Sequence, residues 1–129
     1  MPHAMNLSTL KHAMKSANEG TELRKLGSCD AIMGIRIASK CFAVTFAAFE
    51  VTDVTEIEED ELREVDFYID MKKKDWDAFL QSLEGEAPRS LNELDLENQV
   101  IKSADERRRL TFFQYHRSFQ RFFEIAAAA

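Results

Sequence analysis

Hydrophobic positions recur with two different periods along the chain, and the changes of period divide it into three parts. Apolar residues return every three or four positions at the start, which predicts a helix over about 7–18 and a short second helix over 22–26. Apolar and polar residues then alternate as far as about residue 70, as in strands with one buried face. Helical spacing returns at Trp76 and continues toward the end. We therefore expect a strand-rich middle between helical ends.

The alternating region predicts four strands, which span residues 31–37, 41–49, 50–57 and 65–70. The first three follow one another with only short connections, and we place the first hairpin turn at Ser39-Lys40. An acidic stretch from Glu56 to Glu64 precedes the fourth strand and is expected to form an exposed loop. Strands that follow each other so closely are expected to pair antiparallel.

Helical segments are expected again after the strands. One apolar stripe repeats at i, i+3, i+4 and i+7 and consists of Trp76, Phe79, Leu80 and Leu83. We expect Trp76 to be largely buried against the sheet. Residues 90–93 have the form of a capping box and predict a single helical turn, and residues 94–101 form either a loop or a short strand. A second capping box at 103–106 predicts the start of a long last helix.

These patterns together predict the α+β fold class. A chain of 129 residues makes one domain, 1–129, with its core over about 7–124. We expect a mostly antiparallel sheet of about four to five strands, with helices packed on one face and a long C-terminal helix.

The charge of the chain argues against binding to nucleic acid. The net charge is −6, whereas a nucleic-acid binder needs a basic surface to neutralise phosphates. One basic cluster, Arg107–Arg109 followed by Arg117 and Arg121, lies on the predicted last helix. We assign this cluster to a solvated outer face.

Cysteine usage and hydropathy indicate a cytoplasmic protein. Cys29 and Cys41 are the only cysteines, and neither has the spacing of a CxxC motif or a zinc site. We expect two free thiols, no metal and no cofactor. The first ten residues lack an apolar signal-like stretch, and no run of about 18 apolar residues occurs. The sequence therefore predicts no export and no membrane span.

No catalytic motif is present. The chain lacks a GxSxG elbow, an HExxH motif and a glycine-rich phosphate loop. His116 projects from the aromatic face of the last helix, where it is either a general acid or base or a histidine at the edge of the core. Asp66 and Asp70 point the same way from one strand and are expected to face water. Whether the protein is an enzyme therefore stays open, with a binding protein the preferred interpretation.

Phenylalanine is unusually abundant, with ten residues against one tryptophan. Its ring has no hydrogen-bonding group, so this excess suggests either a large core or an apolar cavity. Several rings from the sheet, the middle helix and the last helix converge on one interior, with Tyr115 or His116 as a polar contact. The candidate ligand-contacting residues are Ile35, Phe46, Phe67, Phe79, Phe112, Tyr115, His116, Phe119 and Phe123. Core packing alone would select the same apolar residues, so both interpretations remain.

Three stretches carry a resemblance to a known family. DFYIDMKKKDWDAFLQSL, residues 66–83, combines an alternating strand, a short turn and a D-W-x-x-F-L helix. NEGTELRKLG and GIRIASKCFAVTF are similar to the short helix and first hairpin of the same family. Over about residues 7–124 the chain resembles the sterol-carrier-protein-2-like domain. Two stretches depart from the family pattern: the turn at 47–49 is not of the Asp-Gly type, and glycines are missing after Pro88.

The resemblance implies a mostly antiparallel sheet with helices on one face and a hydrophobic tunnel for lipids. Members are usually binding or transfer modules without chemistry of their own. Trp76, Phe79 and Leu80 match the helix that packs on the sheet, and residues 112–123 match the C-terminal helix near the tunnel.

Three functions are therefore considered. The first is a non-catalytic carrier for an apolar small molecule (lipid, sterol-like or polyketide-like), bound in a tunnel between the sheet and the C-terminal helix. The second is a small cone-shaped α+β enzyme, an isomerase, hydratase or cyclase, in which His116 is the acid or base. The third is an interaction subunit, a homodimer or the partner of an enzyme, that docks through its Phe-rich last helix.

Overall fold

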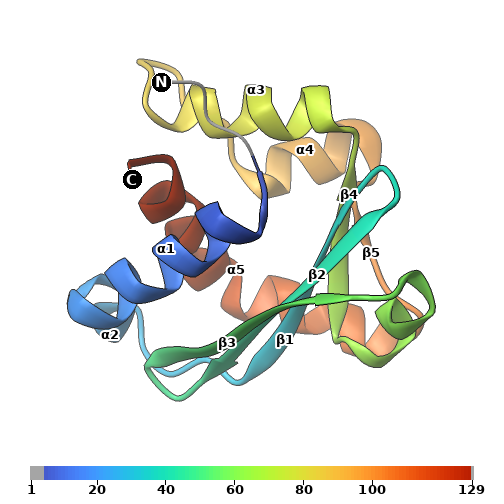
Figure 1. Ribbon diagram of the computed structural model, residues 1–129, viewed down its shortest axis with the longest axis horizontal. Coiled ribbons are helices and arrows are strands. Elements are labelled where there is room, and N and C mark those ends of the chain that lie inside the picture. The colour runs from blue at the N-terminus through green and yellow to red at the C-terminus, as the bar shows by residue number, and fades with distance from the viewer. Residues whose placement is uncertain (1–4, 129) are drawn as a thin grey trace.

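The computed structural model describes residues 5–128 and shows a five-stranded sheet with helices gathered mainly on one side (Figure 1). Residues 1–4 and 129 of the expected domain lie outside the described residues. The elements in chain order are α1 (Leu7–Glu19), α2 (Glu22–Lys25), β1 (Ala31–Ile37), β2 (Lys40–Ala47), β3 (Glu50–Ile57), the 3-10 helix η1 (Glu59–Glu64), β4 (Phe67–Met71), α3 (Lys73–Leu83), α4 (Leu91–Asn98), β5 (Ile101–Lys102) and α5 (Glu106–Ala128). The expected α+β class and the long C-terminal helix are confirmed.

The sheet is mixed, with strand order β3-β2-β1-β4-β5. The pairs β1–β2, β2–β3 and β4–β5 are antiparallel, as expected, but β1 and β4 are parallel. The rule that neighbouring strands in sequence pair antiparallel fails here because β4 does not pair with β3. The chain leaves β3 through η1, crosses the sheet, and returns on the far side of β1. This crossover makes β1 a central strand.

The first hairpin turn lies one residue earlier than expected. Ile37 pairs with Lys40, so the turn residues are Ala38 and Ser39 rather than Ser39 and Lys40. Ala38 adopts φ 55°, because a tight two-residue hairpin needs a left-handed residue there. This register places Met33 opposite Val44 on one face of the sheet.

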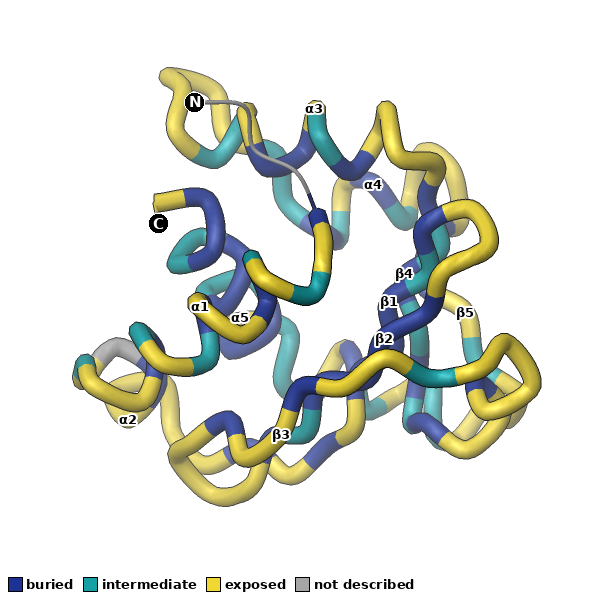
Figure 2. Tube along the Cα trace, in the orientation of Figure 1, coloured by how far each residue is buried: buried dark blue, intermediate teal, exposed yellow. Residues whose placement is uncertain are grey.

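One face of the sheet is covered by α1, α3 and α5, and it forms the main core (Figures 1 and 2). Met33 and Ile35 of β1 and Ile69 of β4 are fully buried on this face because alternate strand residues point the same way. α3 contributes Trp76, which has no exposed surface, so the expected burial of this residue is confirmed.

The opposite face carries a smaller apolar contact under η1. The acidic stretch expected as a loop forms this 3-10 helix because the Glu61 side chain accepts from the N–H of Glu58 and closes its first turn. Its Leu62 is buried over Gly34 of β1. A Cβ on Gly34 would lie 2.7 Å from Cβ of Tyr68 and 3.1 Å from Leu62, so only glycine lets the two layers approach this closely.

The two carboxylates of β4 are not simply solvated. Asp66 Oδ2 accepts from the backbone N–H of Ile32 at 2.7 Å, and Arg108 lies 3.6 Å from its other oxygen. Asp70 forms ion pairs with Arg36 at 3.6 Å and Lys102 at 3.2 Å. The expectation that both face water holds in part: Asp66 and Asp70 keep 27% and 22% of their side chains exposed, but donors from β1, β5 and α5 bind them as well.

At each edge of the sheet, side chains also occupy the outward backbone groups of one residue. At β3, the Asn18 amide donates to the carbonyl of Val51 at 2.8 Å and accepts from its N–H at 2.9 Å. At β5, Asp95 accepts from the N–H of Ile101 at 3.0 Å, and Arg109 donates to its carbonyl at 2.9 Å. Asp95 and Arg109 also form an ion pair at 2.9 Å. Each of these side chains therefore takes the place of a neighbouring strand.

Arginines at the start of α5 anchor the helix rather than forming a solvated face. Arg108 donates to the carbonyls of Arg63 and Glu64 and pairs with Asp66, and Arg109 binds β5 as described. The expected outer face of the helix is therefore wrong for Arg108 and Arg109. The sequence pattern could not show that the carbonyls of Arg63 and Glu64, before β4, and of Ile101, in β5, face these arginines.

Candidate functional site

The candidate site is the interior between the sheet and α5, where aromatic rings meet directly. Phe119 of α5 lies 5.2 Å from Phe46 of β2 and 4.8 Å from Phe67 of β4, between ring centroids. Phe122 lies 5.7 Å from Phe46, and Phe112 lies 5.4 Å from Phe67. All five rings are almost completely buried. α5 is therefore held to the centre of the sheet by aromatic contacts.

These rings belong to a continuous series that reaches two surfaces. In order, with neighbouring ring centroids at most 5.7 Å apart, the series is Phe79, Phe123, Phe122, Phe46, Phe119, Phe67, Phe112 and Phe113. Phe79 lines an open groove at one end, and Phe113 at the other end is 42% exposed and covered by the Arg109 guanidinium at 5.2 Å. We call this set the aromatic series.

One buried polar residue lies beside this apolar interior. Ser118 on α5 is the one buried polar or charged residue among those whose burial the structure describes. It lines a depression without room for a ligand, together with Leu23, Cys29 and Phe46. The sequence analysis missed Ser118; its position four residues before Phe122 on the aromatic face was the available signal.

α5 bends at Tyr115, which divides the helix into two segments. Tyr115 has φ −120° and ψ 22°, which is not helical. Its ring packs at the margin of the core, 6.5 Å from Phe119. His116 is turned away from the aromatic series and is half-buried, with Nδ1 3.4 Å from the Asn92 side-chain amide. The bend separates an anterior half, 106–114, from a posterior half, 115–128.

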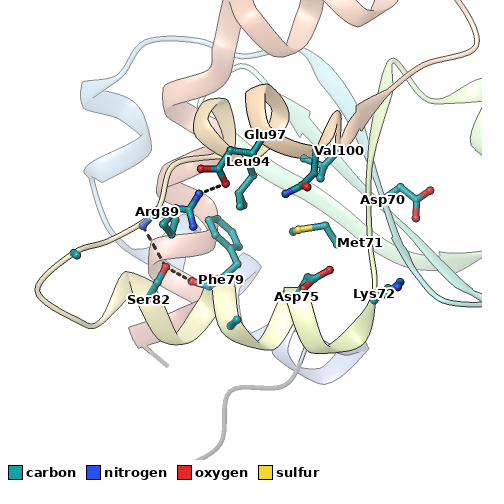
Figure 3. Close-up of a pocket in the computed structure, with 13 residues that line it drawn as sticks. Asp70, Met71, Lys72, Asp75, Phe79, Ser82, Arg89, Leu94, Glu97 and Val100 are labelled. Carbon is teal, nitrogen blue, oxygen red and sulfur yellow. Dashed lines mark hydrogen bonds and ion pairs between the residues drawn. The ribbon is translucent and has the colours of Figure 1, made fainter.

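A groove of about 790 Å³ opens between α3, α4 and the end of β4 (Figure 3). Its apolar floor consists of Met71, Phe79, Leu94 and Val100, which are at most 9% exposed. Figure 3 shows Met71, Phe79 and Leu94 pointing toward one another between the two helices. Charged residues of both signs form the rim: Asp70, Lys72, Asp75, Arg89 and Glu97. The groove therefore combines an apolar floor with a polar margin.

The segment that joins α3 to α4 is tied down at Arg89. The Arg89 side chain pairs with Glu97 and with Glu93 at 3.5 Å. Its backbone N–H donates to Ser82 Oγ at 3.2 Å, and its carbonyl accepts from the Gln120 amide at 3.0 Å. These contacts close one end of the groove and fasten it to the posterior half of α5.

A second hollow of about 330 Å³ contains His116. Asn92 of α4 and Leu26 near α2 line it together with Arg117 and Glu124 of α5. The closest polar partner of His116 is an amide rather than a carboxylate, so the arrangement lacks the acid that would orient a catalytic imidazole. The acid or base role considered for His116 gains no support from this geometry.

The nine candidate residues from the sequence do not all lie in one place. Seven lie in one hydrophobic core: Ile35, Phe46, Phe67, Phe79, Phe112, Phe119 and Phe123. Tyr115 packs at its margin and His116 lies in the separate hollow. Because the aromatic face of α5 is buried, it is not available as an exposed docking face. Whether any of the nine contacts a ligand stays a prediction.

The nucleophilic and metal-binding side chains offer no second site. Burial, with Asp30 and Asp66 nearby, raises the pKa of the Cys29 thiol to about 12. Burial also raises the pKa of Cys41. Both thiols are free, and a neutral buried thiol is a poor nucleophile. Across residues 5–128, no three acidic, histidine or cysteine side chains are arranged to hold a metal ion, and no helix is long and apolar enough to cross a membrane.

Comparison with known proteins gives a match in structure but not in sequence. No family model matches the chain, and no curated protein matches its sequence. A crystal structure of sterol carrier protein 2 superposes with a TM-score of 0.73, covering 95% of this chain and 95% of that one. The two sequences are 12% identical. The chain therefore has the fold of sterol carrier protein 2.

Proposed function

From this shared fold, we propose that the protein is a non-catalytic carrier of an apolar small molecule, a lipid or a sterol-like or polyketide-like compound. The ligand binds between the sheet and the posterior half of α5, among Phe46, Phe67 and Phe119. The name of the structural neighbour describes a carrier of sterols, and the match extends over nearly the whole of both chains. The observation that carries the proposal is that rings of the sheet and of α5 meet directly in this apolar core.

Such an interface can open without breaking the sheet. Three ring pairs join the posterior half of α5 to the sheet: Phe46–Phe119, Phe46–Phe122 and Phe67–Phe119. At about 0.5–1.5 kcal/mol each, these pairs contribute roughly 2–5 kcal/mol beyond their burial, and a ligand that replaces them restores similar contacts. The anterior half stays anchored by Arg108 and Arg109, so the bend at Tyr115 is the natural hinge.

The ligand is expected to bind with micromolar affinity. A dissociation constant of about 1 μM corresponds to roughly −8 kcal/mol. At about 25 cal/mol per Å², this needs roughly 330 Å² of apolar ligand surface removed from water, before the costs of association and of opening the helix. A long acyl chain or a sterol-like ring system provides an area of this order.

The single tryptophan makes the proposal testable by fluorescence. Trp76 lies 5.5 Å from Phe123, inside the same core, so a dansyl-labelled fatty acid in the interior should accept excitation energy from it. Phe119→Asp should abolish binding because an unpaired carboxylate in an apolar interior is costly. Phe49→Asp makes the same chemical change at a ring that is 40% exposed and should bind normally.

Circular dichroism of both variants shows whether the fold survives, and only folded variants are compared. Saturable energy transfer in the wild-type protein, lost in Phe119→Asp and kept in Phe49→Asp, supports the carrier. Folded wild-type protein that binds neither the labelled fatty acid nor a labelled sterol overturns it.

A further inference from the structure

We propose that the groove between α3 and α4 is the passage through which the ligand reaches the interior, and that the Phe79 ring is its gate. This inference rests on the proposed carrier function and adds a route to it. The ligand that passes through is a single-chain amphiphile, whose chain crosses the apolar floor while its polar head moves along the charged rim.

The first argument is that the groove and the interior share one side chain. Phe79 lines the groove, and its ring lies 6.2 Å from Trp76 and 5.7 Å from Phe123 on the core side. It is 2% exposed, so the ring stands between the groove and the packed core. We expect rotation of this ring to open a way from the groove to the aromatic series. Such rotations leave the backbone hydrogen bonds of α3 intact.

The second argument is the size and character of the groove. Its volume of about 790 Å³ lies within the range of roughly 300–1,000 Å³ that small-molecule sites occupy. Met71 and Leu94 continue the apolar surface of Phe79 outward, and charged groups appear only at the margin. A chain with one polar end is the ligand that satisfies both surfaces without burying a charge.

The third argument is that the opposite end of the aromatic series is closed more firmly. Phe113 is covered by Arg109, whose guanidinium is fixed by Asp95 and by the Ile101 carbonyl. Arg108 fixes the same turn of α5 to the chain before β4. Opening that end would break several charge-assisted contacts, each stronger than a ring contact. The groove end needs only a side-chain movement at its floor.

Obstruction of a passage changes the association and dissociation rate constants in a different way from damage to a binding site. A group that obstructs the passage raises the barrier for binding and release equally, so the dissociation constant stays the same while both rate constants fall. Ala78 lies on the groove side of α3 and is exposed, so Ala78→Phe fills the groove without touching the core. Gln81→Phe places the same ring on an exposed position of α3 that does not line the groove.

Stopped-flow energy transfer from Trp76 to the dansyl-labelled fatty acid measures both rate constants. We expect Ala78→Phe to lower association and dissociation by about ten-fold each, and Gln81→Phe to leave them unchanged. Phe79→Leu keeps an apolar but smaller gate and should raise both rates. Circular dichroism and thermal melts establish that each variant is folded, and the two groove variants act in opposite directions, so general destabilisation cannot mimic both.

The outcomes separate this inference from the carrier proposal. If Ala78→Phe binds the fatty acid with wild-type rates, the ligand enters elsewhere and the passage is wrong while the carrier stands. If Ala78→Phe weakens the affinity at an unchanged association rate, the groove is the binding position itself and the passage is again wrong. A wild-type protein that binds no probe overturns both proposals.

Discussion

Removal of the Trp76 side chain should destabilise the fold more than most single changes. The side chain has no exposed surface and packs against Phe79 and Phe123, with ring centroids 6.2 and 5.5 Å away. Trp76→Ala should therefore lower the free energy of unfolding by about 3–5 kcal/mol, the usual range when removal of a large aromatic side chain leaves a cavity. About 1 kcal/mol of this belongs to the hydrogen bond from the indole N–H to the Arg36 carbonyl at 2.9 Å. The free energy of unfolding of a domain of this size is roughly 5–15 kcal/mol, so the loss would be easily measured.

Urea unfolding followed by far-ultraviolet circular dichroism is the suitable assay, because Trp76 is the only tryptophan and its fluorescence disappears with it. Trp76→Phe keeps most of the ring and loses the hydrogen bond, so it should cost only about 1–2 kcal/mol. Leu96→Ala, at a side chain that is 86% exposed, is the control and should stay within about 0.5 kcal/mol of wild type. A Trp76→Ala midpoint equal to that of Leu96→Ala would refute the burial argument.

Two further expectations concern backbone space and thiol burial. Gly34→Ala should lower the free energy of unfolding in urea by about 1–3 kcal/mol, because its Cβ would lie 2.7 Å from that of Tyr68. A stability equal to wild type would show that the residues packed over Gly34 can move apart without cost. Cys29 and Cys41 should react with a thiol reagent only after unfolding, and immediate reaction in the native state would contradict their burial. Burial raises the pKa of the Cys29 thiol from 9.0 to about 12, so the folded state favours the neutral thiol and stability should fall as pH rises between these values. Cys29→Ala should lessen that fall, and an unchanged pH profile would contradict the shift.

Periodicity predicted most elements of the fold because their burial follows a simple repeat. Residues 31–37 alternate and form β1, and residues 50–57 form β3. The last helix begins at Glu106, at the end of the predicted capping box, and its cap is Asp105 rather than Ser103. The parallel β1–β4 pair could not be predicted in this way. Its position depends on η1, whose acidic sequence is typical of an exposed loop and whose Leu62 is its single buried anchor.

The candidate site was predictable in its apolar part and not in its polar part. Phe112, Phe119 and Phe123 share one helical face, and that face lies on the sheet. His116 belongs to the same face of an ideal helix, yet it lies in a separate hollow beside Asn92 of α4. The helical repeat cannot show which neighbouring element covers each part of a face, nor that α5 bends at Tyr115. The groove was likewise beyond prediction, since α4 was expected as a single turn and instead forms a helix of 8 residues.

The occupied sheet edges limit how other proteins can recognise this one. A peptide that binds by adding a strand needs free outward N–H and carbonyl groups at an edge. At β3 it would first have to displace Asn18 from Val51, and at β5 it would have to break the Asp95–Arg109 pair around Ile101. At these two positions, aggregation through the sheet edges meets the same obstacle. A strand that pairs with either edge there would have to replace hydrogen bonds that the folded chain already makes with its own side chains.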